Sequence, residues 1–355
     1  MNNTQYVASP LEKDIDEERP VSFAKIIIFI LLPAVSFFVS LFLGRLFINP
    51  IDVLKILGSK LLFIPFEHTW ADTIETVVIR IRLPRAIMAM VVGSGLSISG
   101  AAFQGMFHNP LVSPYILGVS AGAGFGAALS IVLETSIVML QVFAFAGGII
   151  AVAIAYSLSR VYRVTPILML VLSGIVVSAF FQALISLLKY TADRDDKLPA
   201  IVFWLMGSMS HVHLEDLITV LPAIIIGAAG LLMIRWRINV LSMGEKEARA
   251  MGVNTELVKA MIIVFSTVIS SVVVAFCGII GWVGLIIPHI CRMLVGPDHR
   301  VLLPVTLAVG ATYLIIIDNL ARIISPLEVP LGILTAVIGA PFFAMLLRKT
   351  RGGWG

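Results

Sequence analysis

The sequence predicts an all-α protein that crosses a membrane many times and forms a single transmembrane domain. Only 13% of its 355 residues are charged, 59% are hydrophobic, and the mean hydropathy is +1.03. A water-soluble domain of this size carries much more charge, so the composition excludes that class. Small residues at every fourth position are a second observation, because this spacing lets helices pack closely in lipid.

The first 25 residues differ from the rest of the chain. They are polar and mixed in charge, as in the segment LEKDIDEERP, and they contain nothing that could form a core. The apolar run that follows is too long for a cleavable signal peptide. We therefore expect residues 1–25 to be a flexible cytoplasmic tail and residues 26–350 to be the transmembrane domain.

Ten apolar runs follow the tail, and each is close to the length of about 20 residues that a helix needs to span a bilayer. The stretch 257–294 is too long for one helix, and Gly278, Gly281 and Gly284 divide it into two helices joined by a tight, partly buried turn. The sequence thus predicts about ten transmembrane helices. Their approximate ranges are 26–48, 86–107, 115–133, 137–158, 164–188, 217–236, 257–276, 279–294, 301–318 and 329–347.

The second and third of these runs carry small residues on one helix face and are separated by a polar break, HNP, at 108–110. Such faces allow the backbones of two helices to approach closely. Two helices joined by a tight polar turn indicate a packed bundle rather than a lone anchor. The two ladders of small residues are Gly93, Ser97, Ala101 and Gly105, and Gly118, Gly122 and Gly126.

Lysine and arginine residues predict the orientation. With both termini in the cytoplasm, the inner loops receive most of the basic residues, as expected for a multi-pass protein of the cytoplasmic (inner) membrane. The outer side is nevertheless unusually basic, and Arg82, Arg85 and Arg322 lie at the outer ends of helices. Arginine suits a two-pronged grip on a carboxylate. Side chains that merely reach up to the membrane surface are the commoner alternative.

The loop 237–259, RINVLSMGEKEARAMGVNTELVK, is the only long charged segment on the inner side. Its pattern is that of a short amphipathic helix between two glycines, with mixed charges and a small apolar face. Such a helix suits docking into a groove on a soluble partner, and an ordinary solvated loop is the alternative. The residues of the pattern are Gly244 and Gly252, the charged Glu245 and Arg249, and the apolar Ala248 and Met251.

The sequence carries no phosphate-binding loop, nucleophile elbow or H-E-x-x-H helix, so we expect neither an enzyme nor a bound cofactor. His289 and Cys291 lack further ligands at metal-binding spacing. Cys277 and Cys291 lie in apolar segments and are expected to be buried thiols. A net charge of +4 is the usual basic lean of such membrane proteins and does not indicate nucleic-acid binding.

Five segments occur in the order RLPRAIMAMVVGSGLSISGA, HNPLVSPYILGVSAGAG, LSMGEKEARAMGV, GIIGWVGLIIPHICRMLVGPDHRVLLP and DNLARIISPLEVPLGILTAVIGAPFFAMLL. Together, from about residue 26 to residue 350, the chain resembles the FecCD-type permeases. These are membrane subunits of type II ABC importers for iron–siderophores, haem and cobalamin. The resemblance implies ten transmembrane helices, a second permease subunit around one translocation path, two separate ABC ATPase subunits and a solute-binding protein.

The resemblance also implies roles for particular residues. The loop that contains Gly244, Glu245, Ala248, Arg249 and Gly252 would contact the ATPase. Asn109 and Leu111 match the cytoplasmic gate of the path, and Thr165, in the segment YRVTPIL, is a candidate for a second gate. Acidic residues on the two lobes of the binding protein would be met by Arg82, Arg85 and Arg322.

Two other classes of membrane protein are alternatives to this interpretation. An ion-coupled secondary transporter should show carboxylates or lysines near the middle of several helices, and only Asp318 comes near. An intramembrane enzyme needs paired catalytic residues at membrane depth, and none is apparent. The sequence therefore predicts an importer permease for a metal chelate, with ferric siderophore first and haem or cobalamin as alternatives. The small-residue ladders and the single permease copy further predict a homodimer, or a heterodimer with a close paralogue.

Overall fold

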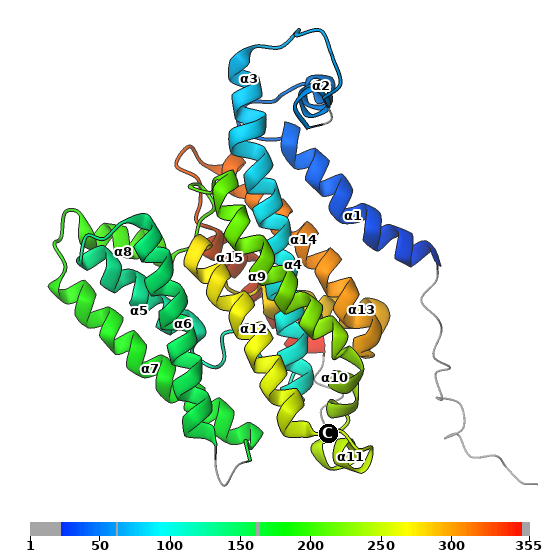
Figure 1. The fold of residues 1–355 in the computed structure, drawn as a ribbon, viewed down its shortest axis with the longest axis vertical. Helices are drawn as coiled ribbons and strands as arrows, with labels where there is room; N and C mark the ends of the chain where they lie inside the picture. The colour runs from blue at the N-terminus through cyan, green and yellow to red at the C-terminus, as the bar shows by residue number, and fades with distance from the viewer. Residues whose placement is uncertain (1–22, 62, 161–163, 350–355) are drawn as a thin grey trace, which may run out of the picture.

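The computed structural model describes residues 23–61, 63–160 and 164–349, which contain helices and no β-strand (Figure 1). Six helical stretches are long and apolar enough to cross a membrane, and four shorter apolar helices accompany them. The all-α, polytopic class is confirmed. The long stretches are Asp72–Phe107, α6 (Ile137–Ser159), α7 (Ile167–Thr191), α9 (Leu214–Met233), α12 (Thr255–Cys277) and α14 (His299–Ile324); the shorter helices are α1 (Phe23–Phe42), α5 (Val119–Val132), α13 (Val283–Val295) and α15 (Leu331–Lys349).

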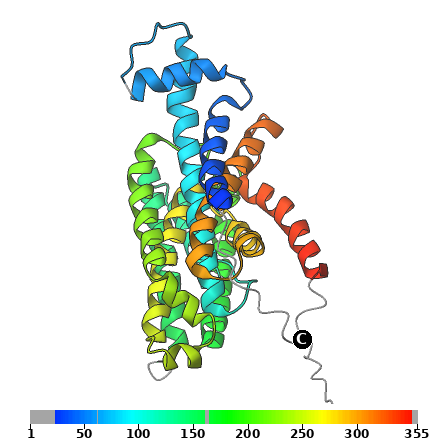
Figure 2. The same cartoon turned by 90° about the vertical axis from the view of Figure 1, so that its right-hand side faces the viewer.

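One continuous helical stretch of 36 residues runs through the molecule. It consists of α3 (Asp72–Thr76), the π-helical η2 (Val77–Arg82) and α4 (Leu83–Phe107). It projects beyond the bundle at one end, where α2 (Pro50–Leu61) lies across it (Figures 1 and 2). The short α11 (Glu245–Ala250) lies at the opposite end. We call these the α3 end and the α11 end.

The two ladders of small residues pack against helices of the same chain. A Cβ atom on Gly93 of α4 would collide with the carbonyl oxygen of Gly310 in α14, and one on Gly122 of α5 would collide with the carbonyl of Gly147 in α6. Close backbone contact at small residues is confirmed. The ladders are therefore occupied within the chain and do not themselves indicate a dimer, which stays a prediction.

The stretch 257–294 forms two helices, as predicted. Helix α12 ends at Cys277, and α13 begins at Val283 after a turn in which Gly278 has a φ of +67°. The backbone N–H of Ser208 donates to the carbonyl of Cys277 at 2.8 Å, so the turn is tied to the segment after α8 (Lys197–Leu205). Gly284 does not break a helix. It lies within α13, and its carbonyl fills the space that a Cβ on Gly100 of α4 would need.

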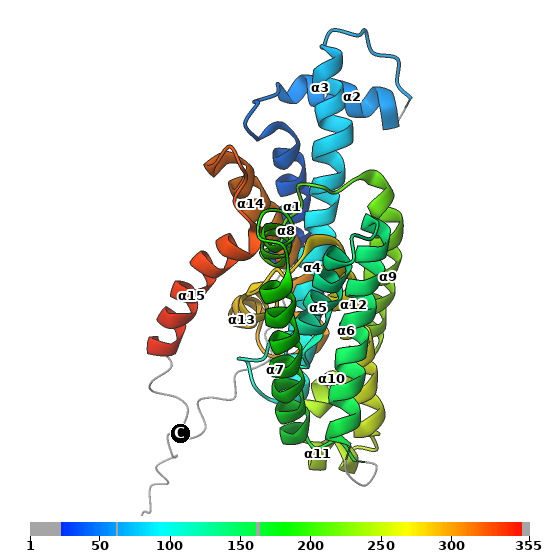
Figure 3. The same cartoon turned by 90° about the vertical axis from the view of Figure 1, so that its left-hand side faces the viewer.

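The remaining helices are arranged around α4 and α12. Helices α5 to α8 form a group on one side, whereas α1 packs against α4 and α14 (Figure 1). Helix α10 (Arg235–Leu241) continues from α9 towards α11. Helix α15 leaves the bundle (Figure 3) and contacts mainly α13 and α14. Its start is held by hydrogen bonds from the N–H groups of Leu331 and Gly332 to the carbonyls of Gly207 and Met206, at 2.9 and 3.1 Å.

Candidate functional site

The segment 244–252 forms a short helix between two glycines, as the sequence predicts. Gly244 precedes α11 with a φ of +136°, and Gly252 follows it with a φ of +78°. The N–H groups of Gly252 and Val253 donate to the carbonyls of Arg249 and Ala248 at 3.0 and 2.9 Å. This pair of bonds is the Schellman motif, which needs a left-handed residue at the position of Gly252.

The predicted apolar face of this helix is not present. Ala248 is fully buried, whereas Met251 is 54% exposed, so the two side chains do not share a face. The reason is that Met251 lies beyond the last helical residue, while Ala248 packs under the closing turn beside the buried Val253. The apolar side chains exposed along this segment and the start of α12 are instead those of Met243, Met251 and Leu257.

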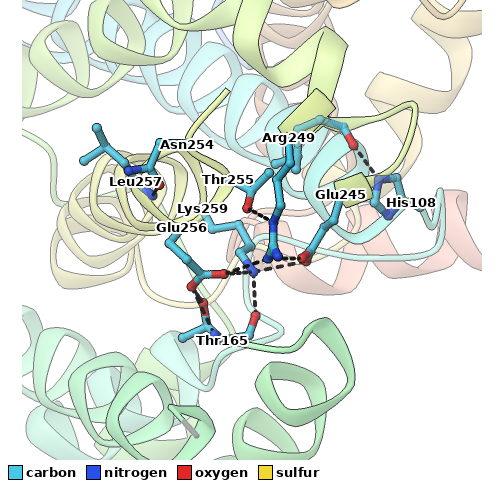
Figure 4. A network of polar contacts seen from close by, with 10 residues as sticks. His108, Thr165, Glu245, Arg249, Asn254, Thr255, Glu256, Leu257 and Lys259 are labelled. Atoms are coloured by element: carbon cyan, nitrogen blue, oxygen red, sulfur yellow. Dashed lines mark hydrogen bonds and ion pairs between the residues drawn. The ribbon is translucent and has the colours of Figure 1, made fainter. Parts of the chain in front are cut away.

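Behind α11 lies a buried lysine that contacts three separate segments (Figure 4). The ammonium group of Lys259, on α12, is 2.6 Å from a carboxylate oxygen of Glu256 in the same helix. It is 3.1 Å from a carboxylate oxygen of Glu245 in α11. It also donates to the backbone carbonyl of Thr165, just before α7, at 2.7 Å. Lys259 has no exposed surface, and each of its contacts is with an acceptor.

Thr165, the candidate for a second gate, belongs to this lysine cluster. Its N–H donates to Glu256 at 3.0 Å, and its hydroxyl donates to the same carboxylate oxygen. Arg249 completes the cluster by donating to the hydroxyl of Thr255 at 3.2 Å and to Glu245 at 3.3 Å. The structure thus brings together the predicted residues Glu245, Arg249 and Thr165.

Asn109 and Leu111 lie together in an exposed turn at the α11 end. The side-chain oxygen of Asn109 accepts a hydrogen bond from the N–H of Leu111 at 2.9 Å. Helix α4 ends just before this turn with His108 in the left-handed region, at a φ of 51°. The imidazole of His108 donates to the carbonyl of Leu241 in α10 at 2.6 Å. The predicted gate turn is therefore connected to the helix that leads into α11.

Gln104 and Arg292 support the turn from inside, and neither residue was predicted to do so from the sequence. The buried amide of Gln104 donates to the carbonyls of Leu285 and Val112, at 3.2 and 3.4 Å. Its oxygen accepts a hydrogen bond from Arg292 at 3.0 Å. A glutamine inside an otherwise apolar helix is the signal that would have identified this position.

At the α3 end, two of the three predicted docking arginines share one buried carboxylate. Arg85 on α4 is 2.7 Å from Asp318 on α14, and Arg322, one turn after Asp318, is 3.3 Å from it. Arg85 also pairs with Glu328, in the turn before α15, at 2.8 Å. Helix α14 continues to Ile324, beyond the predicted end at residue 318, and so places these groups inside the bundle.

Arg82 is buried as well and donates to the carbonyls of Leu41, at 2.9 Å, and Leu46. None of the three arginines therefore matches the exposed docking group or the side chain reaching for the membrane surface that the sequence suggested. A direct contact between them and a binding protein stays a prediction. Arg80 is exposed on η2, two residues before Arg82.

A cavity of about 980 Å³ lies at the junction of α6, α8, α9, α12 and the turn before α15. Its polar lining includes His211, His213, Glu215, Asp216 and Glu328. Among the described residues, no three His, Cys, Asp or Glu side chains are grouped to hold a metal ion. Cys277 and Cys291 are buried free thiols, as expected.

The sequence matches the FecCD transport family over residues 31–349. It is 40% identical to the molybdate import system permease of Haemophilus influenzae, over 94% of this chain and 98% of that protein. It is 41% identical to a permease named for iron chelatin transport in Helicobacter pylori, over 79% and 85% of the two chains. Other relatives are named for cobalamin import and hemin transport.

A solved structure described as a metal-chelate type ABC transporter in an inward-facing conformation shares the fold. The TM-score is 0.82 and the sequence identity 40%, with 92% of this chain and 100% of that chain covered. The agreement extends over nearly the whole transmembrane domain. The chain therefore belongs to the FecCD transport family and is an ABC importer permease.

Proposed function

We propose that this chain moves a metal chelate, with ferric siderophore as the first candidate, across the cytoplasmic membrane in a complex driven by ATP. The observation that carries the proposal is the link between α11 and the Asn109 turn. The exposed helix follows α10, and α10 is bonded through Leu241 to His108 at the start of that turn. A partner that moves α11 is thereby placed to move the predicted gate of Asn109 and Leu111.

The α11 end is proposed to face the cytoplasm, with both termini on that side. Exposed basic side chains on α10 and α11 support this orientation, because cytoplasmic loops carry an excess of lysine and arginine. These side chains are Arg235, Arg237, Lys246 and Arg249. Two ABC ATPase subunits would bind here, and no cofactor or nucleic acid is proposed.

The solute-binding protein is proposed to dock at the α3 end, with Arg82, Arg85 and Arg322 as the predicted contacts. The guanidinium group of Arg85 already forms ion pairs with Asp318 and Glu328. A carboxylate of the partner would therefore bind Arg85 only if Glu328 moved away from it. Arg80 is better exposed for a first encounter. Asp318 lies between two guanidinium groups, which is the arrangement of a structural ion pair and speaks against an ion-coupled carrier.

The cargo is the least constrained part, since relatives of similar identity are named for molybdate, cobalamin and iron chelatin. A cavity of about 980 Å³ supports a bulky chelate, because sites for such molecules measure roughly 300–1,000 Å³. Uptake into proteoliposomes that contain the complete importer tests this with labelled ferric siderophore, hemin, cobalamin and molybdate. We expect ferric siderophore to accumulate. Uptake of molybdate alone would overturn the cargo and leave the importer function standing.

The assembly is expected to contain two permease chains and two ATPases, since the proposed path lies between two permeases. Native mass spectrometry of the detergent-solubilised complex measures this composition. A homodimer gives one permease mass, and a heterodimer with a paralogue gives two. A complex of one permease and one ATPase that transports at full rate would contradict the expectation.

Met251→Glu is expected to weaken ATPase binding about tenfold or more, because loss of an apolar anchor from a protein interface costs about 2 kcal/mol or more. Met251 is exposed, so the substitution leaves the buried lysine cluster intact. The matched control is Leu54→Glu, which places the same charge on the exposed face of α2 at the α3 end. Titration of ATPase onto immobilised permease measures the affinity. Equal affinity in wild type and Met251→Glu would show that α11 is only a solvated linker.

A further inference from the structure

The lysine cluster behind α11 consists of Lys259, Arg249, Glu245, Glu256 and Thr165. Its lysine is buried, although the packing of a membrane-spanning helix does not require a buried cation. Lys259 is fully buried, and lysine is almost never in that position unless it is paired. An ammonium group has three N–H donors, and Lys259 has three acceptors within 3.1 Å. The acceptors come from α11, from α12 and from the segment before α7. One side chain thus connects three parts of the fold.

The charges of the cluster balance. Lys259 and Arg249 are the cations, Glu245 and Glu256 are the anions, and each cation lies within 4.0 Å of both carboxylates. Both carboxylates keep about a quarter of their surface exposed, whereas the ammonium group has none. Removal of the lysine would leave the two carboxylates with the exposed Arg249 as their shared cation. Glu245 would then lose its ion pair with Lys259 of α12, whereas Glu256 would keep its hydrogen bonds from Thr165.

Thr165 is held by this cluster through its whole backbone unit. Its carbonyl accepts from Lys259, and its N–H and hydroxyl both donate to Glu256. Helix α7 begins two residues later, at Ile167. The start of α7 is therefore fixed to α12, and Lys259 extends the same fixation to Glu245 on α11.

We propose that Lys259 is a positioning residue that joins α11 to the start of α7, so that a displacement of α11 reaches the Thr165 segment as a rigid movement. This proposal deepens the proposed function and rests on it, because it gives the ATPase contact a direct route to a second helix besides the one through His108 and α4. The observation that carries it is the shared ammonium group, to which Glu245 and Thr165 both bind.

The test measures whether α11 and α7 keep a fixed separation. Spin labels on Lys246→Cys and Leu168→Cys, two exposed positions on α11 and α7, report the distance between them. The native cysteines are buried and do not label. Labelled chains are diluted with unlabelled ones so that only distances within one chain are observed. We expect one narrow distance distribution in the wild-type background, with or without ATP on the assembled complex.

Three variants test whether the contacts of Lys259 keep this distance distribution narrow. Lys259→Met should broaden the distribution, and Lys259→Arg should keep it narrow because charge and donors remain. Glu245→Gln should broaden it without loss of folded protein, since it weakens the ion pairs of Glu245 with Lys259 and Arg249 and leaves Lys259 paired with Glu256. The matched control, Lys197→Met, removes an ion-paired lysine from α8 and should change nothing. Narrow distributions in both Lys259→Met and Glu245→Gln would overturn the proposal. Failure of wild-type permease to bind any ATPase would overturn the proposed function instead, because the labelled permease alone still reports the link.

Discussion

Asp318→Ala is expected to be among the most destabilising single substitutions in the described part of the chain. The carboxylate is fully buried between Arg85 and Arg322, so its removal leaves the buried Arg322 without its carboxylate partner and Arg85 with Glu328 alone. Breaking a buried ion pair in this way costs about 3–5 kcal/mol. Thermal unfolding in detergent, followed by the fraction of monodisperse protein after heating, measures the loss.

Two variants serve as comparison for Asp318→Ala. Arg80→Ala removes an exposed charge from the same helical stretch and should alter stability by less than about 0.5 kcal/mol. Glu328→Ala should lie between the two, because Glu328 is partly exposed and Arg85 keeps Asp318 as a partner. The arginine cluster consists of Arg85, Arg322, Asp318 and Glu328. Unfolding of Asp318→Ala at the wild-type temperature would mean that this cluster contributes nothing to the stability of the fold.

Gly100→Val is expected to prevent normal packing of α4 against α13. The added side chain would occupy the position of the Gly284 carbonyl, and a backbone carbonyl cannot turn aside as a side chain can. Overpacking in a well-packed core costs about 1–3 kcal/mol and more when backbone must move. We expect low recovery of folded protein and a lowered unfolding temperature.

The control for Gly100→Val is Gly281→Ala, at the α12–α13 turn. A Cβ at Gly281 meets no atom within 4 Å, so this glycine has room for a methyl group. Gly281→Ala should fold and unfold as the wild type does. If Gly100→Val were recovered in equal yield and stability, the close approach of α4 and α13 would not be a requirement of the fold.

The main helices were predictable because each is a long apolar run, and such runs identify their own class without knowledge of their neighbours. The structure places all ten close to the predicted ranges, apart from the extension of α14 to Ile324, the early end of α1 and the helical stretch from Asp72 that leads into α4. Helix α2 was not predicted. It is short, and its apolar residues Val53 and Ile56 belong to a buried cluster that includes Trp70 and Val78, which lie further along the chain.

The polar clusters were also predictable only where the signal is local in the sequence. The glycines around α11 predicted a short helix because a left-handed residue is a local signal. The contacts of Lys259 with Thr165 and of Arg85 with Asp318 join residues 94 and 233 positions apart. No periodicity within one helix reveals such a partner. For that reason the sequence placed the arginines on a surface, whereas the folded chain uses them to connect α4, α14 and the turn before α15.

The divergence of α15 bears on how the protein is made. Synthesis proceeds from the N-terminus, so α15 is the last described helix to enter the membrane. The other helices of the bundle have been synthesised by then and can already pack against one another. Glu328, the last residue of the arginine cluster, precedes α15, and the buried ion pairs can close before this helix arrives. The exposed flank with Val337 and Met345 must then be covered by lipid or by another chain. Insertion into the membrane would thus end with a completed bundle and with α15, one flank of which contacts lipid or another chain.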